Sequence, residues 1–550
     1  MRINNKIQVL CKAVLIGLMT VLCASCETRP YSDDTYRIGG FISGELAAEG
    51  LKIVSQSGEV VDVIGRQFSF KKELREGDSY SVDVAEQPGV QICKIQNGTG
   101  VVLGKNIDDI EVRCRSWRTE QAIFQKVASK TTKMVVDKDD QRHAIAVWQQ
   151  VSDTSDDSDI WANLYKEDSG TWFEIKQLNG EVSGPSTNPQ LSSQGDRDLY
   201  VVWEEEDAGS DSKILFVRHN QDVTQPPQIV KTGDVSEPKV ASNDQGDVIV
   251  LWLQADAETG NNQVFYAIAD RDSGWGFSNG EIVNDGLGDA SDVQVAMNHN
   301  GDAVAVWLEA DENNVNQVRG KFYDSEKKAW FGNGNNEAFL INFKSDEADK
   351  AAFSPELTID GNGNVVVAWV QQGVDKASNS VWINTYSPST NANGWGNAVE
   401  VDVENAGNVV SDSIKLMAYK STQVMIVWSQ DDGFGTNRVW AITHKPNGQW
   451  RGVALSNLPS ETGVESGEQP QIAQDGDGNV IVVWRQSIAG NKTIWTSTYT
   501  PTSGWGMPEQ IEADGAGDST EPLIAMGQSG HAMAIWRKEV SGDLFSNLFE

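Results

Sequence analysis

Acidic side chains gather in the loops that follow a recurring tryptophan, and their spacing is the clearest sign of chemistry in this chain. Such a cluster can steer a cationic partner through its electrostatic field, or supply oxygen ligands to a divalent ion. The alternative is a solvated rim on an acidic protein. The candidate binding face comprises Asp156, Asp157, Glu204, Glu205, Glu206, Asp207, Asp256, Glu309, Asp311, Asp431 and Asp432.

Other catalytic or metal-binding patterns are sparse. The five histidines are scattered along the chain without a close pair, so no zinc site is predicted. Asp475, Asp477 and Asn479 alternate as in a calcium loop, but the further carboxylate of a complete loop is absent. This favours a hairpin turn, with calcium as the alternative and no other cofactor expected. Carboxylates from distant loops could still meet as a glycosidase pair, which leaves a hydrolase or lyase open.

Eight apolar runs that end in tryptophan determine where these loops lie. Their spacing averages about 55 residues, which lies within the range of propeller and solenoid repeats. Each unit offers four short β-type segments, most clearly from Pro470 to Trp505, and four strands per unit predict a propeller blade. We expect the tryptophans to pack between blades rather than to bind sugars. The eight runs end at Trp148, Trp203, Trp252, Trp307, Trp369, Trp428, Trp484 and Trp536.

The eighth unit runs out after its third segment, at the C-terminus. Residues 116–123, just before the first unit, look like the fourth segment of the seventh unit at 504–511. The sequence therefore predicts an all-β fold in which residues 116–550 form an eight-bladed β-propeller. An N-terminal strand would close the ring and remove the exposed sheet edges.

The N-terminus has the features of an export signal. Residues 1–25 carry Arg2, Lys6 and Lys12 around an apolar stretch that is too short to span a bilayer. Ala24 and Ser25 before Cys26 resemble the lipobox of bacterial lipoproteins, which implies lipidation of Cys26. Glu27, in place of the Asp that favours inner-membrane retention, implies the outer membrane or cell surface. Residues 26–36 are expected to form a tether.

Residues 37–115 contain short alternating β-type runs separated by glycine-rich turns, which predict a small antiparallel β-sandwich. The order of these runs resembles the immunoglobulin-like or transthyretin-like modules of bacterial surface lipoproteins, which usually act as spacers. Cys93 and Cys114 are the two cysteines that remain outside the export segment. In an exported protein they predict one disulfide.

The formal net charge of −35 makes nucleic acid a poor partner, and we expect membrane contact only through the N-terminal lipid. The sequence favours a lipid-anchored, non-catalytic platform that binds a protein or a glycan. It is similar in plan to the propeller lipoprotein of the outer-membrane barrel-assembly machinery. The alternative is a polysaccharide-acting hydrolase or lyase with its active site in the central channel of the propeller.

Overall fold

The computed structural model consists of β-strands, turns and loops. It describes residues 34–550 except for 44–49, 90, 125–130, 139–142, 152–156, 167–168, 174, 181–183, 194–197, 207–211, 221–222, 271–275, 279, 287, 335, 343–349, 375–376, 389–394, 402, 404–405, 420–422, 445–451, 457–463 and 514–516. No α-helix occurs among these described residues. The same residues accordingly contain no helix with the length and hydropathy needed to cross a membrane.

The first ten strands form a small N-terminal unit with its own core. Its two four-stranded sheets have the orders β5-β2-β10-β8 and β4-β3-β7-β9. Ile42, Ile53, Val84 and Ile110 are buried between them, as expected for strands with one inward face. The strands are β1 (Thr35–Tyr36), β2 (Ile38–Ser43), β3 (Lys52–Ser55), β4 (Val60–Asp62), β5 (Gln67–Ser69), β6 (Leu74–Arg75), β7 (Ser79–Glu86), β8 (Ile92–Gln96), β9 (Thr99–Val101) and β10 (Ile107–Arg115).

The remaining strands form sheets of four or five antiparallel strands, which we number in chain order. Sheet 1 contains β12 (Thr131–Lys138), β13 (His143–Val151), β14 (Ser158–Lys166), β15 (Thr171–Trp172) and β16 (Lys176–Gln177). Sheet 2 contains β17 (Ser186–Ser193), β18 (Asp198–Glu206), β19 (Ser212–Asn220), β20 (Val223–Thr224) and β21 (Gln228–Gly233). Sheet 3 contains β22 (Val235–Ser242), β23 (Val248–Ala255), β24 (Asn262–Ala269) and β25 (Glu281–Ile282). Sheet 4 contains β26 (Ala290–Met297), β27 (Ala303–Ala310), β28 (Asn316–Asp324), β29 (Ala329–Phe331) and β30 (Phe339–Leu340).

The second half of the chain continues the same order. Sheet 5 contains β31 (Ala352–Ile359), β32 (Val365–Gln372), β33 (Asn379–Tyr386) and β34 (Val399–Glu400). Sheet 6 contains β35 (Lys415–Tyr419), β36 (Gln423–Asp431), β37 (Asn437–His444) and β38 (Gly452–Ala454). Sheet 7 contains β39 (Val464–Gln474), β40 (Val480–Ile488), β41 (Asn491–Thr500), β42 (Gly504–Trp505) and β43 (Glu509–Gln510). Sheet 8 contains β44 (Ser519–Met526), β45 (Ala532–Lys538), β46 (Leu544–Phe549) and, from the other end of the chain, β11 (Gln121–Phe124).

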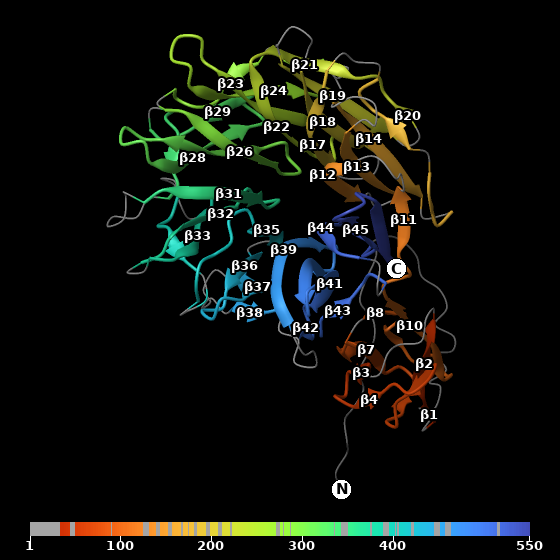
Figure 1. The fold of residues 1–550 in the computed structure, drawn as a ribbon. Helices are drawn as coiled ribbons and strands as arrows, with labels where there is room; N and C mark the ends of the chain where they lie inside the picture. The colour runs from red at the N-terminus through yellow and green to blue at the C-terminus, as the bar shows by residue number, and fades with distance from the viewer. Residues whose placement is uncertain are drawn as a thin grey trace, which may run out of the picture.

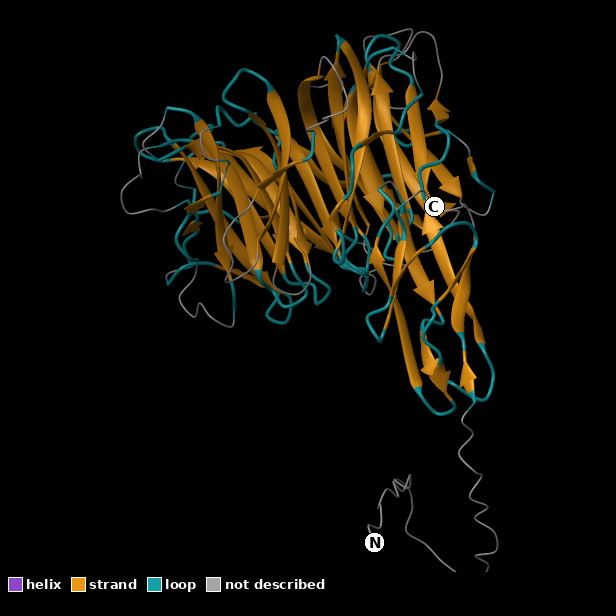
Figure 2. Ribbon diagram, turned by 90° about the horizontal axis from the view of Figure 1, so that it is seen from below, coloured by secondary structure: helices purple, strands orange, loops and turns teal. Residues whose placement is uncertain are grey.

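These sheets are arranged radially around a common centre (Figure 1). The first strand of each sheet is innermost and contacts the first strand of the next, and β44 contacts β12 in turn. Seen from the side, the sheets stand next to one another and the N-terminal unit projects beyond the ring (Figure 2). The prediction of an all-β propeller is confirmed. In the last sheet, β11 pairs antiparallel with β46, so strands from the two ends of the chain lie in one sheet.

The second strand of each sheet lies in the core between neighbouring sheets. The eight tryptophans that end the apolar runs have no exposed surface. In sheets 1, 3, 5, 6 and 7 the indole Nε1 donates a hydrogen bond to a glutamine two residues later, over 2.9 to 3.4 Å. Because a buried N–H is costly without an acceptor, this Trp-Xaa-Gln pattern makes a large polar-tipped side chain suitable for the core.

At one interface, two neighbouring sheets are joined through such a glutamine. Asn342, which follows the fourth strand of sheet 4, accepts a hydrogen bond from the Val318 N–H and donates one to Gln371 of sheet 5. Gln371 in turn accepts from the indole of Trp369. We call this arrangement of one residue from each sheet the amide seam.

Candidate functional site in the central channel

The innermost strands share an unusual backbone feature. Near the start of the first strand in sheets 2 to 8, one polar residue has a positive φ between 48° and 63°. In six of these sheets the pairing register shifts next to this residue, which marks a β-bulge. Left-handed backbone is uncommon for non-glycine residues and costs free energy. The residues are Asn188, Glu237, Asp292, Ser354, Asp412, Gln469 and Glu521.

Hydrogen bonds link these left-handed residues from one sheet to the next. The Glu237 carboxylate accepts from the backbone N–H of Asp292, whose own carboxylate accepts from the N–H of Ser354. The Ser354 hydroxyl and the backbone N–H of Asp412 continue the series at 3.3 Å. Across sheets 7 and 8, Gln469 Oε1 accepts from the Glu521 N–H at 3.0 Å. Each of these bulges thus finds its acceptor in the preceding sheet, and we call this ring of residues the polar girdle.

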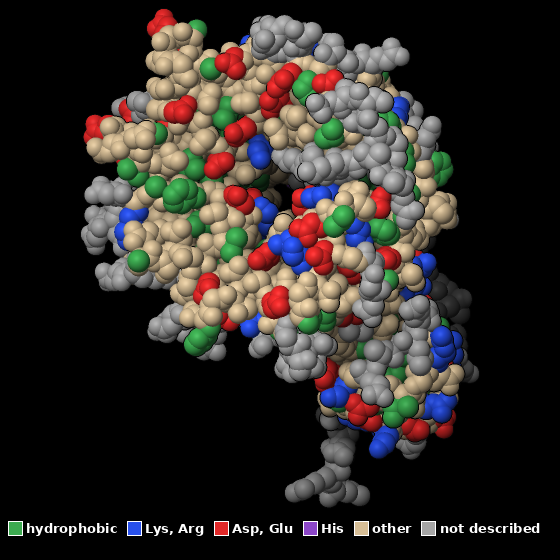
Figure 3. Space-filling view, viewed as in Figure 1, with side chains coloured by type: hydrophobic (Ala, Val, Ile, Leu, Met, Phe, Trp, Pro, Cys, Tyr) green, Lys and Arg blue, Asp and Glu red, His purple; other side chains and the backbone are tan. Residues whose placement is uncertain are grey.

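Charged residues on or just before the innermost strands of sheets 3 to 6 form one electrostatically coupled group, which we call the channel cluster. It comprises Glu237, Lys239, Asp292, Glu356, Asp412 and Lys415. All lie on or directly before innermost strands. The centre of the ring is hollowed, and acidic and basic side chains surround the hollow (Figure 3).

The environment displaces the pKa of three of these groups. Burial raises the pKa of Glu237, and the neighbouring carboxylate of Asp292 raises it further. Burial also raises the pKa of Asp292, with repulsion from Asp412 in the same direction. Burial lowers the pKa of Lys239, although Glu356 and Glu237 favour its charged form. The channel therefore holds two carboxyl groups that retain protons more strongly than usual, beside an ammonium that loses its proton more easily.

The opposite side of the ring also carries ion-paired charges, as Lys415 and Glu356 do within the channel cluster. Arg537 Nη2 binds Glu521 Oε1 at 2.5 Å, and Arg485 binds Glu468. Both arginines directly follow a core tryptophan, Trp484 or Trp536.

One member of the predicted acidic face approaches the channel cluster. Glu204 Oε2 accepts a hydrogen bond from Asn188 of the girdle at 3.2 Å, and its charge acts on Glu237. Glu206, two residues later, is exposed. Neither Glu204 nor Glu206 is itself a member of the channel cluster.

Glu205 and Glu309 occupy the glutamine position of the Trp-Xaa-Gln pattern. Their exposed fractions are 2% and 1%, so neither presents a carboxylate to solvent. Glu205 lies 3.9 Å from Lys213 Nζ, and Glu309 lies 3.1 Å from Arg319 Nε and accepts a hydrogen bond from Asn284. Glu309 thereby joins sheets 3 and 4, whereas the contact of Glu205 with Lys213 lies within sheet 2.

Four further residues of the predicted face cap their own turns. Asp256 accepts hydrogen bonds from the N–H groups of residues 258 and 259, and these bonds lower its pKa. Asp311, Asp431 and Asp432 accept from backbone N–H groups two to four residues later in the same way. Asp157 is exposed. Asp156 and Asp207 lie outside the described residues, so a shared binding face remains a prediction.

The Asp475–Asn479 turn contacts the N-terminal unit. Asp475 Oδ1 accepts from the N–H groups of Asp477 and Asn479, as in a hairpin turn. Lys94 of β8 places its ammonium between Asp475, at 3.0 Å, and Asp477. Within the described ranges, no group of three or more His, Cys, Asp or Glu side chains is arranged to hold a metal ion. On the same strand as Lys94, Cys93 faces Cys114 of β10, with their sulfur atoms 2.05 Å apart.

Sequence reasoning missed the polar girdle, although the chain contains a signal for it. A polar residue followed by proline recurs at the start of first strands: Asn188-Pro189, Glu237-Pro238, Ser354-Pro355, Gln469-Pro470 and Glu521-Pro522. Proline has no N–H to donate to a β-ladder, so its recurrence inside predicted strands marks a bulge. The polar residues vary in type, which conceals the pattern when side chains alone are compared.

Comparison with known proteins gives low similarity throughout. No protein-family model matches the chain, and no curated protein matches it. A search of solved structures finds the polysaccharide lyase Uly1, with a TM-score of 0.42 and 11% identity over 68% of this chain and 90% of that one. It also finds a protein of unknown function from Dyadobacter fermentans, with a TM-score of 0.37 and 14% identity over 60% of this chain and 99% of that one.

The β-propeller domain of the Trilobed protease from Pyrococcus furiosus is similar at the same level, with a TM-score of 0.36 and 9% identity over 66% of this chain and 92% of that one. α-L-Arabinofuranosidases and an α-L-arabinanase are also among the matching structures. The fold assignment follows from the strand topology described above. The chain is an all-β protein of the β-propeller type.

Proposed function

We propose that this chain is a hydrolase or lyase that acts on a polysaccharide in the central channel of an eight-bladed propeller closed by β11. The observation that carries this proposal is the channel cluster, in which Glu237 and Asp292 have raised pKa values beside Lys239 with a lowered one. Functional sites are where such opposite displacements concentrate. The strained backbone of the polar girdle at the same place supports this assignment.

The cluster contains the groups that either reaction requires. In hydrolysis, a carboxyl group with a raised pKa protonates the glycosidic oxygen while a second carboxylate activates water or attacks the sugar. In elimination from a uronate, an uncharged amine removes the proton from the carbon next to the carboxylate while a cation neutralises that carboxylate. The glycosidic C–O bond then breaks, a C=C double bond forms, and the leaving oxygen takes up a proton. Glu237 and Asp292 would serve the first reaction. Lys239 as base and Lys415 as the cation would serve the second.

The test is incubation of the purified protein with a panel of neutral and uronate-containing polysaccharides. We expect new reducing ends with at least one substrate. An ultraviolet-absorbing unsaturated product would identify a lyase, and a saturated product a hydrolase. For a hydrolase, Glu237→Gln and Asp292→Asn are each expected to lower the rate at least tenfold, and for a lyase Lys239→Met is, because each removes a proton-transferring group of that reaction. Glu258→Gln, in an exposed loop, is the matched control and should retain the rate.

Binding of a polysaccharide without any cleavage would overturn the catalytic proposal. It would support instead the non-catalytic protein or glycan platform that the sequence favours. Equal rates in wild type and all three channel variants would move the active site away from the channel cluster.

We further propose that the propeller is lipid-anchored at the outer membrane or cell surface. Lipidation of Cys26, residues 26–36 as a tether and residues 37–115 as a disulfide-bonded spacer together support this arrangement. Cys26 and the segment before it lie outside the described residues. Labelled palmitate should be incorporated by the full chain and not by Cys26→Ser, with Cys93→Ser as the control that retains the label. Incorporation by Cys26→Ser would contradict the anchor.

A further inference from the structure

An aromatic pair recurs where the third and fourth strands of a sheet meet. Tyr165 faces Trp172 in sheet 1, Tyr323 faces Trp330 in sheet 4, and Tyr499 faces Trp505 in sheet 7, with ring centroids 5.3 to 5.5 Å apart. Tyr386 with Trp395 and Phe549 with Trp117 form corresponding pairs in sheets 5 and 8. These rings add apolar area at the interfaces where they occur.

The tryptophan of each pair packs against the preceding sheet. Trp330 contacts Tyr266 of sheet 3, and Trp395 contacts Phe322 of sheet 4. Trp172 donates a hydrogen bond from its indole to Ser546 of sheet 8 at 2.9 Å. The tryptophan therefore fills the space between its own sheet and the one before it.

Sheet 2 departs from this rule at both positions of the pair. His219 stands at the place of the tyrosine and Thr224 at the place of the tryptophan, and they face each other across β19 and β20. His219 Nδ1 lies 3.1 Å from Thr224 Oγ1. At the next interface, Phe277 packs on Phe216 with ring centroids 4.9 Å apart.

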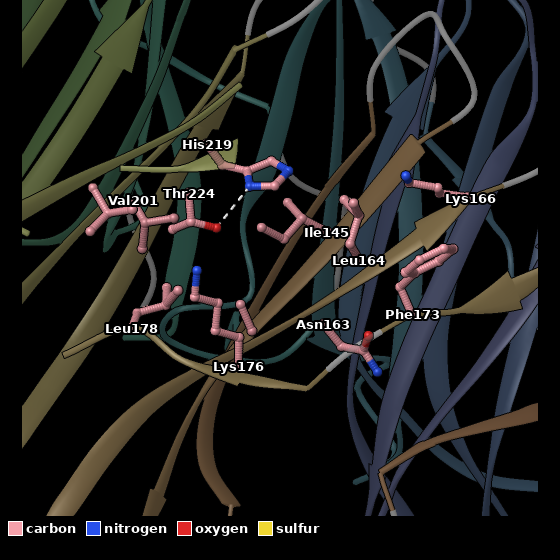
Figure 4. A pocket seen from close by; sticks show the side chains of 12 residues that line it. Ile145, Asn163, Leu164, Lys166, Phe173, Lys176, Leu178, Val201, His219 and Thr224 are labelled. Carbon is pink, nitrogen blue, oxygen red and sulfur yellow. Dashed lines mark hydrogen bonds between the residues drawn. The ribbon is translucent and has the colours of Figure 1, made fainter. Parts of the chain in front are cut away.

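A pocket of about 320 Å³ lies where the missing tryptophan would pack, between sheets 1 and 2. Its walls are apolar and include Ile145, Ala162, Leu164, Leu178, Val201 and Val217. Its volume is at the lower end of the range for small-molecule sites. His219 and Thr224 lie at one side of it, and the ammonium of Lys176 points toward them (Figure 4).

The polar part of the pocket is cationic. No described carboxylate pairs with Lys176, which is exposed at the rim. Lys166 lies over the Phe173 ring, with its ammonium 4.5 Å from the ring centroid. An aromatic ring fits the apolar walls because an indole fills the equivalent space at other interfaces, and an attached anionic group would pair with Lys176.

We propose that this rim pocket binds a small aromatic carboxylate, with the ring between sheets 1 and 2 and the carboxylate at Lys176. The site is separate from the channel cluster and does not depend on the proposed polysaccharide activity.

Calorimetry with indole-3-acetate, indole and tryptamine tests the proposal on the whole protein. We expect the acetate to bind at least tenfold more tightly than tryptamine, which carries the same ring with a positive charge. Lys176→Glu should remove this preference and leave the affinity for uncharged indole unchanged. Lys105→Met, an exposed lysine of the N-terminal unit, is the control and should change neither affinity.

The double variant His219→Tyr/Thr224→Trp restores the aromatic pair found in other sheets. It is expected to abolish binding of all three probes. It should also raise the melting temperature, and a cooperative melt at the higher temperature would show that the variant has folded. Equal affinity for the acetate and tryptamine would overturn the proposal. Unchanged binding by the refilled variant would place the ligand elsewhere, and absence of binding to the wild type would identify the pocket as a packing defect.

Discussion

A chain truncated before Leu544 is expected to lose its cooperative thermal transition or to melt tens of degrees below the full-length protein. The deleted strand, β46, lies between β45 and β11 in sheet 8. It buries Leu544, Leu548 and Phe549, which are 0%, 5% and 0% exposed. At about 2–3 kcal/mol for each buried side chain, the loss reaches about 6–9 kcal/mol. This is comparable with the whole stability of an ordinary domain.

Thermal melts followed by near-ultraviolet circular dichroism measure this effect. Val540→Ser is the matched control, because Val540 lies in the preceding turn with 95% of its side chain exposed and should leave the midpoint unchanged. Trp117→Ala tests the same sheet from the other end of the chain, since Trp117 packs on Phe549 with ring centroids 5.4 Å apart. A truncated protein with the full-length midpoint would contradict the closure of the ring.

The second prediction concerns the seam between sheets 7 and 8, where an ion pair replaces two amides. Lys538 Nζ lies 3.2 Å from Glu512 Oε1, and their side chains are 7% and 1% exposed. Glu512 also accepts a hydrogen bond from the Ile494 N–H, as Asn342 does from Val318 in the amide seam. Glu512→Asn alone leaves a buried ammonium without its partner and is expected to cost about 3–5 kcal/mol.

Lys538→Gln alone is expected to be similarly destabilising near pH 7, because it leaves the Glu512 carboxylate buried without a counter-ion. Burial already raises the pKa of Glu512, so protonation should make this variant less destabilised at acidic pH. The double variant Glu512→Asn/Lys538→Gln rebuilds the amide seam, because the introduced glutamine can accept a hydrogen bond from the Trp536 indole. Its stability should return close to that of the wild type.

Denaturant unfolding of the wild type, the two single variants and the double variant gives the coupling free energy of the pair. We expect it to exceed about 2 kcal/mol, within the range measured for residues in one network. Additive single costs would show that the two charges do not stabilise each other.

Much of the architecture follows from the sequence because the packing requirement recurs in every unit. A second strand buried on both faces must be apolar throughout, and the closing tryptophan repeats at nearly constant spacing. The segment around Trp117 could be matched with the fourth segment around Trp505 because that segment also recurs from unit to unit. The eight core tryptophans proved buried, in agreement with the interpretation that they pack rather than bind sugars.

The channel could not be predicted in the same way. Glu237 and Asp292 lie 55 residues apart and come together only because neighbouring sheets place equivalent positions side by side. Their shared property is a left-handed backbone, which side-chain patterns do not reveal. For the acidic loops the sequence interpretation erred in the opposite way, because residues expected at the surface are buried. Glu205 and Glu309 look like solvated loop carboxylates, yet each lies two residues after a core tryptophan, at a buried position of the repeat.

The amide seam and its ionic counterparts also restrict which sheet can follow which in the ring. At the interfaces between sheets 3 and 4, 4 and 5, and 7 and 8, a buried polar residue of one sheet pairs with one of the next, so the later sheet is compatible only with the residue that the preceding sheet presents. Lys538 requires Glu512 before it, and Glu309 requires Asn284 together with Arg319 of its own sheet. If sheet 8 followed sheet 4, Lys538 would meet the amide of Asn342 instead of the carboxylate of Glu512. The units at these interfaces are therefore not interchangeable, because the buried polar residue of each one matches only the residue of the sheet before it.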